Sequence, residues 1–90
     1  MSNKVLEKAA RAFQLPAEIV AGVPKVEIIG GHELRIENHK GIISYDPQAV
    51  LVSGGEVKLL VKGEGFTISA MNALELRLEG QVFSVELRWD

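Results

Sequence analysis

Apolar residues recur along the chain with two different periods, and the period changes near residue 25. In the first part, apolar side chains fall at the spacing of one stripe along a helix, with charged residues on the other side. The stripe consists of Val5, Leu6, Ala9, Ala10 and Phe13. We therefore predict an amphipathic helix over residues 2–14, capped by Ser2, and a short second turn that Pro16 opens. A helix of this length is marginal in water, so its apolar stripe should pack on another surface.

From Lys25 onward, apolar and polar residues alternate with a period of two, which is typical of strands that bury one face. Turn-forming residues divide this region into seven or eight short segments. The pattern predicts a hairpin turn at Asn38-His39-Lys40-Gly41 and chain reversals at residues 63–65 and 80–81. The predicted strands are residues 26–28, 33–37, 42–45, 49–52, 57–62, 66–68, 74–79 and 83–89.

Short strands without helices between them favour antiparallel pairing, because parallel strands need long crossover connections. The sequence therefore predicts an all-β fold, an antiparallel β-sandwich or meander of seven to eight short strands with an N-terminal amphipathic helix. A small barrel is the alternative. Residues 1–24 form the predicted helical segment and residues 25–90 the antiparallel β domain. The 90 residues suffice for one compact unit.

Several apolar residues fall at positions that the alternation assigns to the outward face. They are Ile42, Leu51, Leu60 and Met71. Such a face must be covered, either by the N-terminal helix or by a second copy of the chain. If the chain self-associates, Ile42, Leu60 and Met71 are the predicted interface residues, and Leu60→Lys should dissociate the assembly without unfolding it.

Two segments of the chain resemble each other. LLVKGEGFTI at residues 59–68 aligns with LRLEGQVFSV at residues 76–85, with glycine on glycine and phenylalanine on phenylalanine. Two hairpins that bury the same face and carry a glycine in the turn would also look alike. The similarity therefore does not require a duplication.

Composition and charge exclude several classes of function. The chain has no cysteine, so disulfides, thiolate metal sites and cysteine nucleophiles are absent. Its formal net charge is −2, which is not the basic footprint of a nucleic-acid-binding domain. No run of apolar residues approaches the roughly 18 that a membrane-spanning helix needs.

The polar residues do not form a reactive pattern. His32 and His39 are seven residues apart, a spacing that matches no zinc motif, and no serine lies in a G-x-S-x-G elbow. We therefore expect no catalytic residues, no metal, no cofactor and no small-molecule substrate. The glutamates that alternate with apolar residues are typical of an exposed strand face, and they are Glu33, Glu37, Glu75, Glu79 and Glu86.

Two other functions stay open at this stage. A domain that binds a small ligand or a cell-wall glycan would stack it on Tyr45, Phe66 or Trp89 in a cleft. A hydrolase would need two of the glutamates to converge in one pocket.

Five segments carry a resemblance to a known family. In order along the chain they are LPAEI at residues 15–19, VPKV at residues 23–26, IENHKGI at residues 36–42, VKGEGFTI at residues 61–68 and LELRLEGQV at residues 74–82. The chain resembles the YabP/YqfC family of sporulation proteins, most closely its YqfC branch. The likeness covers nearly all of residues 15–89, and I-E-N-H-K-G is its most specific string.

This resemblance implies a small protein of endospore-forming bacteria, made in the mother cell during sporulation. It implies that the chain is encoded near a larger membrane-associated sporulation protein of the YqfD type, which is the expected partner, and it implies no enzymatic activity. We accordingly expect a non-catalytic interaction or assembly module in the mother-cell cytoplasm, with a peripheral place at the forespore membrane as the alternative. Self-association is a second expected mode of interaction.

The I-E-N-H-K-G string also has a local physical meaning. Asn38 tolerates a positive φ and Gly41 provides the conformation from which the next strand starts, so the string is first of all a turn. His39 and Lys40 at its tip could also contact a partner. The partner-binding candidates are Asn38, His39, Lys40, Ile42, Leu60 and Met71.

Overall fold

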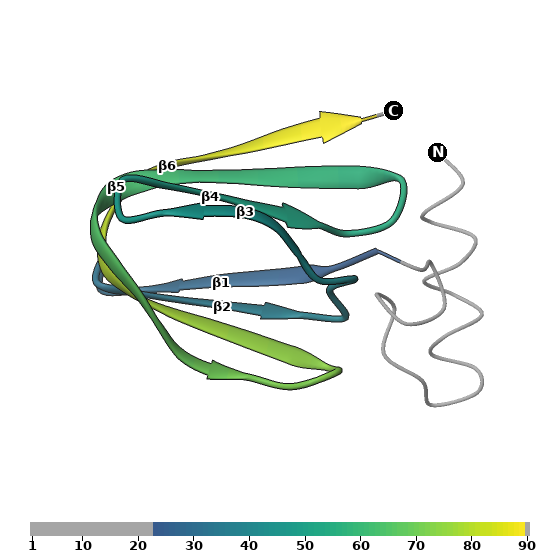
Figure 1. Ribbon diagram of the computed structural model, residues 1–90, viewed down its shortest axis with the longest axis horizontal. Coiled ribbons are helices and arrows are strands. Elements are labelled where there is room, and N and C mark those ends of the chain that lie inside the picture. The colour runs from purple at the N-terminus through teal and green to yellow at the C-terminus, as the bar shows by residue number, and fades with distance from the viewer. Residues whose placement is uncertain (1–22, 90) are drawn as a thin grey trace.

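The computed structural model describes residues 23–89, which form one antiparallel sheet of six strands (Figure 1). The order across the sheet is β1-β2-β6-β5-β4-β3. The predicted all-β antiparallel fold is confirmed, whereas the helices predicted before residue 23 lie outside the described residues. The strands are β1 (Lys25–Ile29), β2 (Glu33–Glu37), β3 (Ile42–Asp46), β4 (Ala49–Ser53), β5 (Val57–Met71) and β6 (Glu75–Trp89).

The two long strands fold this sheet into two layers. The first half of β6 pairs with β2, and the first half of β5 pairs with β4. The β1–β2 layer therefore holds β1, β2, the first half of β6 and the second half of β5. The β3–β4 layer holds β3, β4, the first half of β5 and the second half of β6. Because β1 and β3 stand at the two ends of the strand order, the sheet does not close into a barrel.

The strand count differs from the prediction because two predicted chain reversals are bends within strands. β5 runs through residues 63–65 and β6 runs through residues 80–81. The pairing of β5 with β6 shifts register between Lys62 and Gly63 and again between Glu64 and Thr67. Such bulges bend a strand without ending it. The glycines that predicted turns therefore lie where each long strand passes from one layer to the other.

A hairpin between β2 and β3 was also a wrong prediction. β2 pairs with β1 and β6, whereas β3 pairs with β4. Residues 38–41 therefore cross from one layer to the other. Alternation identifies the buried face of a strand but carries no information about which strand lies beside it.

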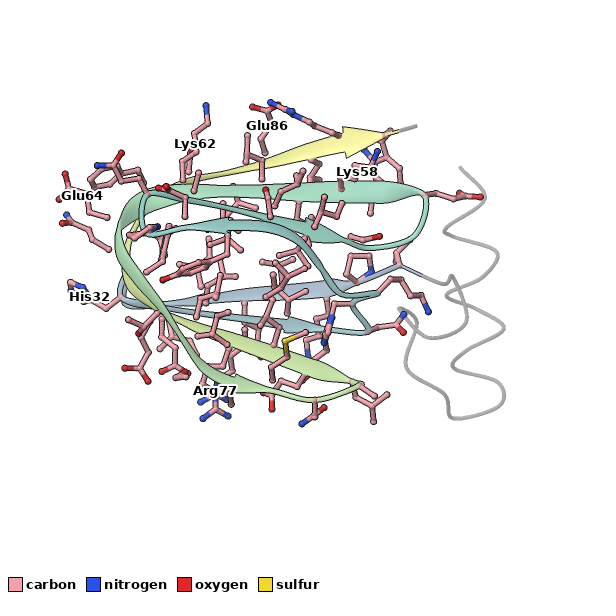
Figure 2. All side chains as sticks on the ribbon, viewed as in Figure 1. His32, Lys58, Lys62, Glu64, Arg77 and Glu86 are labelled. Carbon is pink, nitrogen blue, oxygen red and sulfur yellow. The ribbon has the colours of Figure 1, made fainter. Side chains whose placement is uncertain are left out.

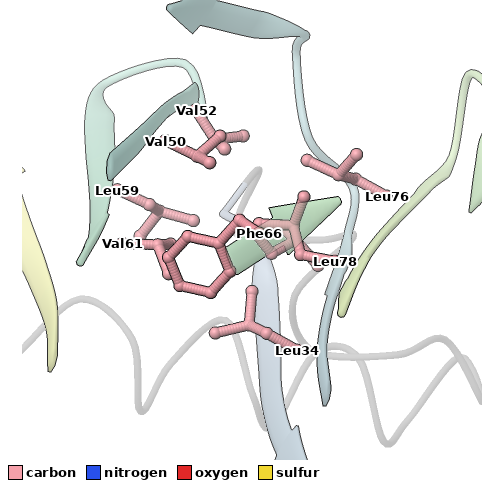
Figure 3. Close-up of a cluster of buried hydrophobic side chains, with 9 residues drawn as sticks. Leu34, Val50, Val52, Leu59, Val61, Phe66, Leu76 and Leu78 are labelled. Atoms are coloured by element: carbon pink, nitrogen blue, oxygen red, sulfur yellow. The ribbon is translucent and has the colours of Figure 1, made fainter. Parts of the chain in front are cut away.

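The core lies between the layers and is built around Phe66 (Figure 3). Phe66 is in the bend of β5 and is 1% exposed. A Cβ atom on Gly80 would lie 2.8 Å from its ring, so the bend in β6 makes room for it. The other members come from both layers, and they are Leu34, Ile36, Leu76 and Leu78 in one and Val50, Val52, Leu59 and Val61 in the other.

Two of the four residues predicted to face outward lie on the inward side. Ile42 pairs with Val52 and packs against the core, and Met71 pairs with the buried Leu76. Bulges between Ile42 and Ser44 and between Ile68 and Ala70 change the phase of the alternation, which the sequence pattern does not reveal. Leu51 and Leu60 do share the outer face of the β3–β4 layer, where they are direct partners.

Candidate interaction surfaces

The crossover of residues 38–41 ties the two layers together at one end. Asn38 has a φ of 62°, as its turn propensity predicts, and its N–H donates to the carbonyl of Leu74 at 2.8 Å. Its side-chain Nδ2 donates to the carbonyl of Val23 at 2.9 Å. On the other layer, Lys40 N–H donates to the Ser53 carbonyl at 2.7 Å and Ser53 N–H donates to the Gly41 carbonyl at 2.8 Å. The crossover is therefore fixed from both sides.

His39 is buried in this crossover, contrary to its predicted place at an exposed tip. It is 6% exposed. Its Nδ1 accepts from Gly41 N–H at 3.0 Å, and its Nε2 lies 2.8 Å from the Asn72 carbonyl. Because an amide N–H donates and a carbonyl accepts, this geometry requires a neutral ring with its hydrogen on Nε2. His39 acts as a clamp between the crossover and the β5–β6 turn.

Loss of the His39 clamp should lower stability. We expect His39→Ala to reduce the free energy of unfolding by about 2 kcal/mol, since it leaves Gly41 N–H and the Asn72 carbonyl without their partner. Urea unfolding of the two proteins measures this difference. His32→Ala is the control, because His32 is exposed in the β1–β2 turn and its loss should cost less than about 0.5 kcal/mol. Equal losses in the two variants would contradict the clamp.

Beside the clamp is an open hollow of about 590 Å³, which we call the crossover hollow. It brings His39 and Lys40 next to Met71, a residue more than 30 positions away in the sequence. Met71 is 51% exposed and Lys40 is exposed as well. The hollow therefore places the Lys40 cation beside the apolar side chains of Met71 and Ala73, and within residues 23–89 no carboxylate lines it. The lining residues are His39, Lys40, Gly41, Met71, Asn72 and Ala73.

The remaining predicted residues lie elsewhere. Ile42 packs against the core, and the Asn38 side chain donates a hydrogen bond to the backbone carbonyl of Val23. Leu60 lies on the outer face of the β3–β4 layer, between Leu51 and Glu86 on the neighbouring strands.

Figure 2 shows Lys58, Lys62 and Glu86 on the outer side of that layer, and Arg77 on the outer side of the other. The structure therefore joins His39, Lys40 and Met71 but separates them from Leu60.

A second hollow, of about 350 Å³, lies between β1 and the second half of β6. Leu87 and Trp89 line it and are 54% and 62% exposed. The alternation assigns both residues to the inward face. It does not show that their strand lies at the edge of its layer, where inward side chains stay exposed, so this hollow was not predicted from the sequence. The other lining residues are Val23, Pro24, Val26, Val57 and Leu59.

The three aromatic residues proposed for ligand stacking do not share a cleft. Phe66 is buried in the core. Tyr45 is in β3 and Trp89 is in β6, so they lie on opposite edge strands of the β3–β4 layer. The Tyr45 hydroxyl donates to the carbonyl of Phe66. This arrangement gives no common stacking platform for a glycan.

Glu33, Glu75 and Glu86 lie on outer faces and pair with arginines. On the β1–β2 layer, Arg35 donates to Glu33 at 2.8 Å, and this hydrogen bond raises the pKa of the Arg35 guanidinium. On the β3–β4 layer, the hydrogen bond from Arg88 lowers the pKa of Glu86. Residues 23–89 contain no group of three or more histidines and acids placed to hold a metal ion.

These features define a small antiparallel β domain with apolar side chains along its open edges. The YabP family model matches residues 21–89, and the chain belongs to the YabP family. The chain is 25% identical over 80 residues to the "Uncharacterized protein YqfC" of Bacillus subtilis (strain 168), an alignment that covers 89% of this chain and 86% of that protein. No solved structure matches the chain. The resemblance that the sequence motifs indicated is confirmed.

None of the elements formed by residues 23–89 is a helix with the length and apolar character needed to cross a membrane.

Proposed function

We propose that this chain is a non-catalytic sporulation protein whose β domain binds a membrane-associated sporulation protein of the YqfD type in the mother cell. Membership of the YabP family and the likeness to YqfC support the sporulation role. The partner and the place, the mother-cell cytoplasm or the surface of the forespore membrane, follow from the resemblance to the YabP/YqfC family. The chain binds and holds its partner and does not transform it.

The observation that carries the binding role is the crossover hollow and the apolar side that continues from it. Met71 is exposed at the hollow, and Ile68 and Tyr45 are exposed along the same open side, between β3 and the second half of β5. Exposed apolar residues that gather on one side of a small domain mark a surface for other protein. Among residues 23–89, those that line the hollow include no pair of acids of the kind a hydrolase would need.

The chemistry of the hollow indicates what the partner presents. Met71 is an adaptable apolar contact, and Lys40 is an exposed cation beside it. A partner segment with an apolar side chain next to a carboxylate fits both groups. The apolar contact supplies affinity, and the carboxylate sets orientation through Lys40.

Affinity capture from sporulating cells tests this proposal. The tagged full chain should recover a membrane-associated sporulation protein, and Met71→Lys should reduce that recovery about tenfold. Leu60→Lys is the matched control, because it places the same charge on the other half of β5, on an outer face away from the hollow. If Leu60→Lys abolishes recovery and Met71→Lys preserves it, the binding surface lies on that outer face instead. Capture of no membrane sporulation protein would contradict the proposal.

A further inference from the structure

The second half of β6 is an open edge of the β3–β4 layer, drawn in yellow in Figure 1. The last backbone bonds on its free side come from Gly80 N–H to the His32 carbonyl and from Val82 N–H to the Gly31 carbonyl. Residues 84–89 pair with residues 57–62 of β5 without a register shift, and among residues 23–89 no strand pairs with their other side. An unpaired strand edge of this kind is a template for another strand.

The other edges of the sheet are less suited to strand addition. β3 is interrupted by a bulge between Ile42 and Ser44, and the second half of β5 by one between Ile68 and Ala70. β1 has five residues and follows Pro24, which has no N–H to donate. The edge formed by residues 84–89 is longer than β1 and has no bulge.

We propose that two copies of the chain pair through this edge, antiparallel and about a two-fold axis at Leu87. In a symmetric antiparallel pair of strands, some residue must face its own copy, because directly opposed side chains point to the same face. The choice of that residue fixes every other pair. The side chains of β6 distinguish the possible registers by charge.

Centring the pair on Glu86 opposes two glutamates, and centring it on Arg88 opposes two arginines. Centring it on Val85 places Glu86 against Ser84 and Arg88 against Val82, so neither charge faces an oppositely charged residue of the second copy. Centring it on Leu87 places Glu86 of each copy opposite Arg88 of the other. Opposite charges across strands stabilise a sheet and like charges destabilise it, so charge complementarity selects Leu87.

This register also gives partners in the second copy to side chains of β6 that are exposed in a single copy. Glu86 and Arg88 now pair within one strand, with both side chains about half exposed. On the other face of the strand, Leu87 opposes Leu87 of the second copy and Val85 opposes its Trp89. The exposed Leu87 and Trp89 side chains thereby gain apolar neighbours, and the layer continues as β3-β4-β5-β6 followed by the same strands in reverse order.

The self-pairing goes beyond the proposed function and uses a different surface. The crossover hollow is lined by residues 39–41 and 71–73, none of which belongs to the second half of β6. A variant that loses self-association should therefore still bind the membrane partner, and a variant that loses the membrane partner should still self-associate.

Charge reversal on the purified full chain tests the register. Wild-type protein should sediment as a dimer, and Glu86→Arg or Arg88→Glu should each raise the dissociation constant at least about tenfold. An equimolar mixture of the two variants should dimerise again, because each arginine of one variant then opposes a glutamate of the other. Both variants lack the pair within the strand, so restoration in the mixture reports contact between copies.

A cysteine crosslink tests the position of the axis. The chain has no cysteine, so Leu87→Cys adds the first thiol. Directly opposed residues of paired strands have Cα atoms about 4.5–5.5 Å apart, within disulfide range, so mild oxidation should give a covalent dimer. Phe83→Cys is the control, since Phe83 is also exposed but lies beyond the paired segment, and it should not crosslink.

Three outcomes would overturn the self-pairing. One is a wild-type chain that stays monomeric at millimolar concentration. Another is a dimer that both charge variants retain, as would occur if Leu60 formed the interface and Leu60→Lys dissociated it. The third is a mixture of the two charge variants that stays monomeric while circular dichroism shows both to be folded.

Discussion

Replacing Gly63 with alanine should lower the free energy of unfolding by about 3 kcal/mol, the upper end of what overpacking costs. A Cβ atom at this position would overlap the backbone carbonyl of Gln81 and lie 2.6 Å from the ring of Phe66. A carbonyl in a paired strand cannot move aside as a flexible side chain can. The bend of β5 must therefore open, and the two layers with it.

Gly55→Ala separates this steric effect from the general cost of losing a glycine. Gly55 has a φ of +89°, and a Cβ atom added there would have no neighbouring atom within 4 Å, so its replacement costs only backbone strain, about 1 kcal/mol. Urea unfolding measured on both variants gives the comparison. A loss at Gly63 no greater than that at Gly55 would contradict close contact at the bend.

Phe66→Ala should reduce the free energy of unfolding by about 4 kcal/mol, because it empties the centre of the core. Phe83 is the matched control, since it occupies the equivalent place in the similar segment of residues 76–85 and is 59% exposed. Phe83→Ala should cost less than about 1 kcal/mol. Thermal and urea unfolding measure both changes.

This comparison also addresses the origin of the internal similarity. If the two segments were equivalent hairpins, the two phenylalanines would contribute equally to stability. In the structure the segments are the two long bent strands, with Gly63 and Gly80 at their bends, and one aromatic ring fills the space between the layers. Equal losses in the two variants would contradict this asymmetry.

The alternation of residues was sufficient to predict the buried faces of most strands. Leu34 and Ile36 of β2 and Leu76 and Leu78 of β6 are buried, and the glutamates and arginines between them are on the outer face. These faces depend on neighbours in sequence, so a sequence pattern carries them. The family was likewise identified from short motifs spread over the chain.

The features that sequence analysis missed depend on distant parts of the chain. His39 is buried because Asn72, 33 residues away, accepts its hydrogen bond, and nothing near His39 in the sequence indicates this. Ile42 and Met71 were assigned to the wrong face because single-residue bulges reverse the alternation. Glycines at 63 and 80 read as turns because the same residue permits both a reversal and a bend.

The way β5 and β6 pass through both layers has a consequence for how the molecule comes apart. Each layer contains half of each long strand, so neither layer is a subdomain that could melt while the other persists. Disruption at either end of the β5–β6 ribbon propagates along the same pair of strands to the opposite end. The β-sheet domain therefore denatures cooperatively, in one thermal transition.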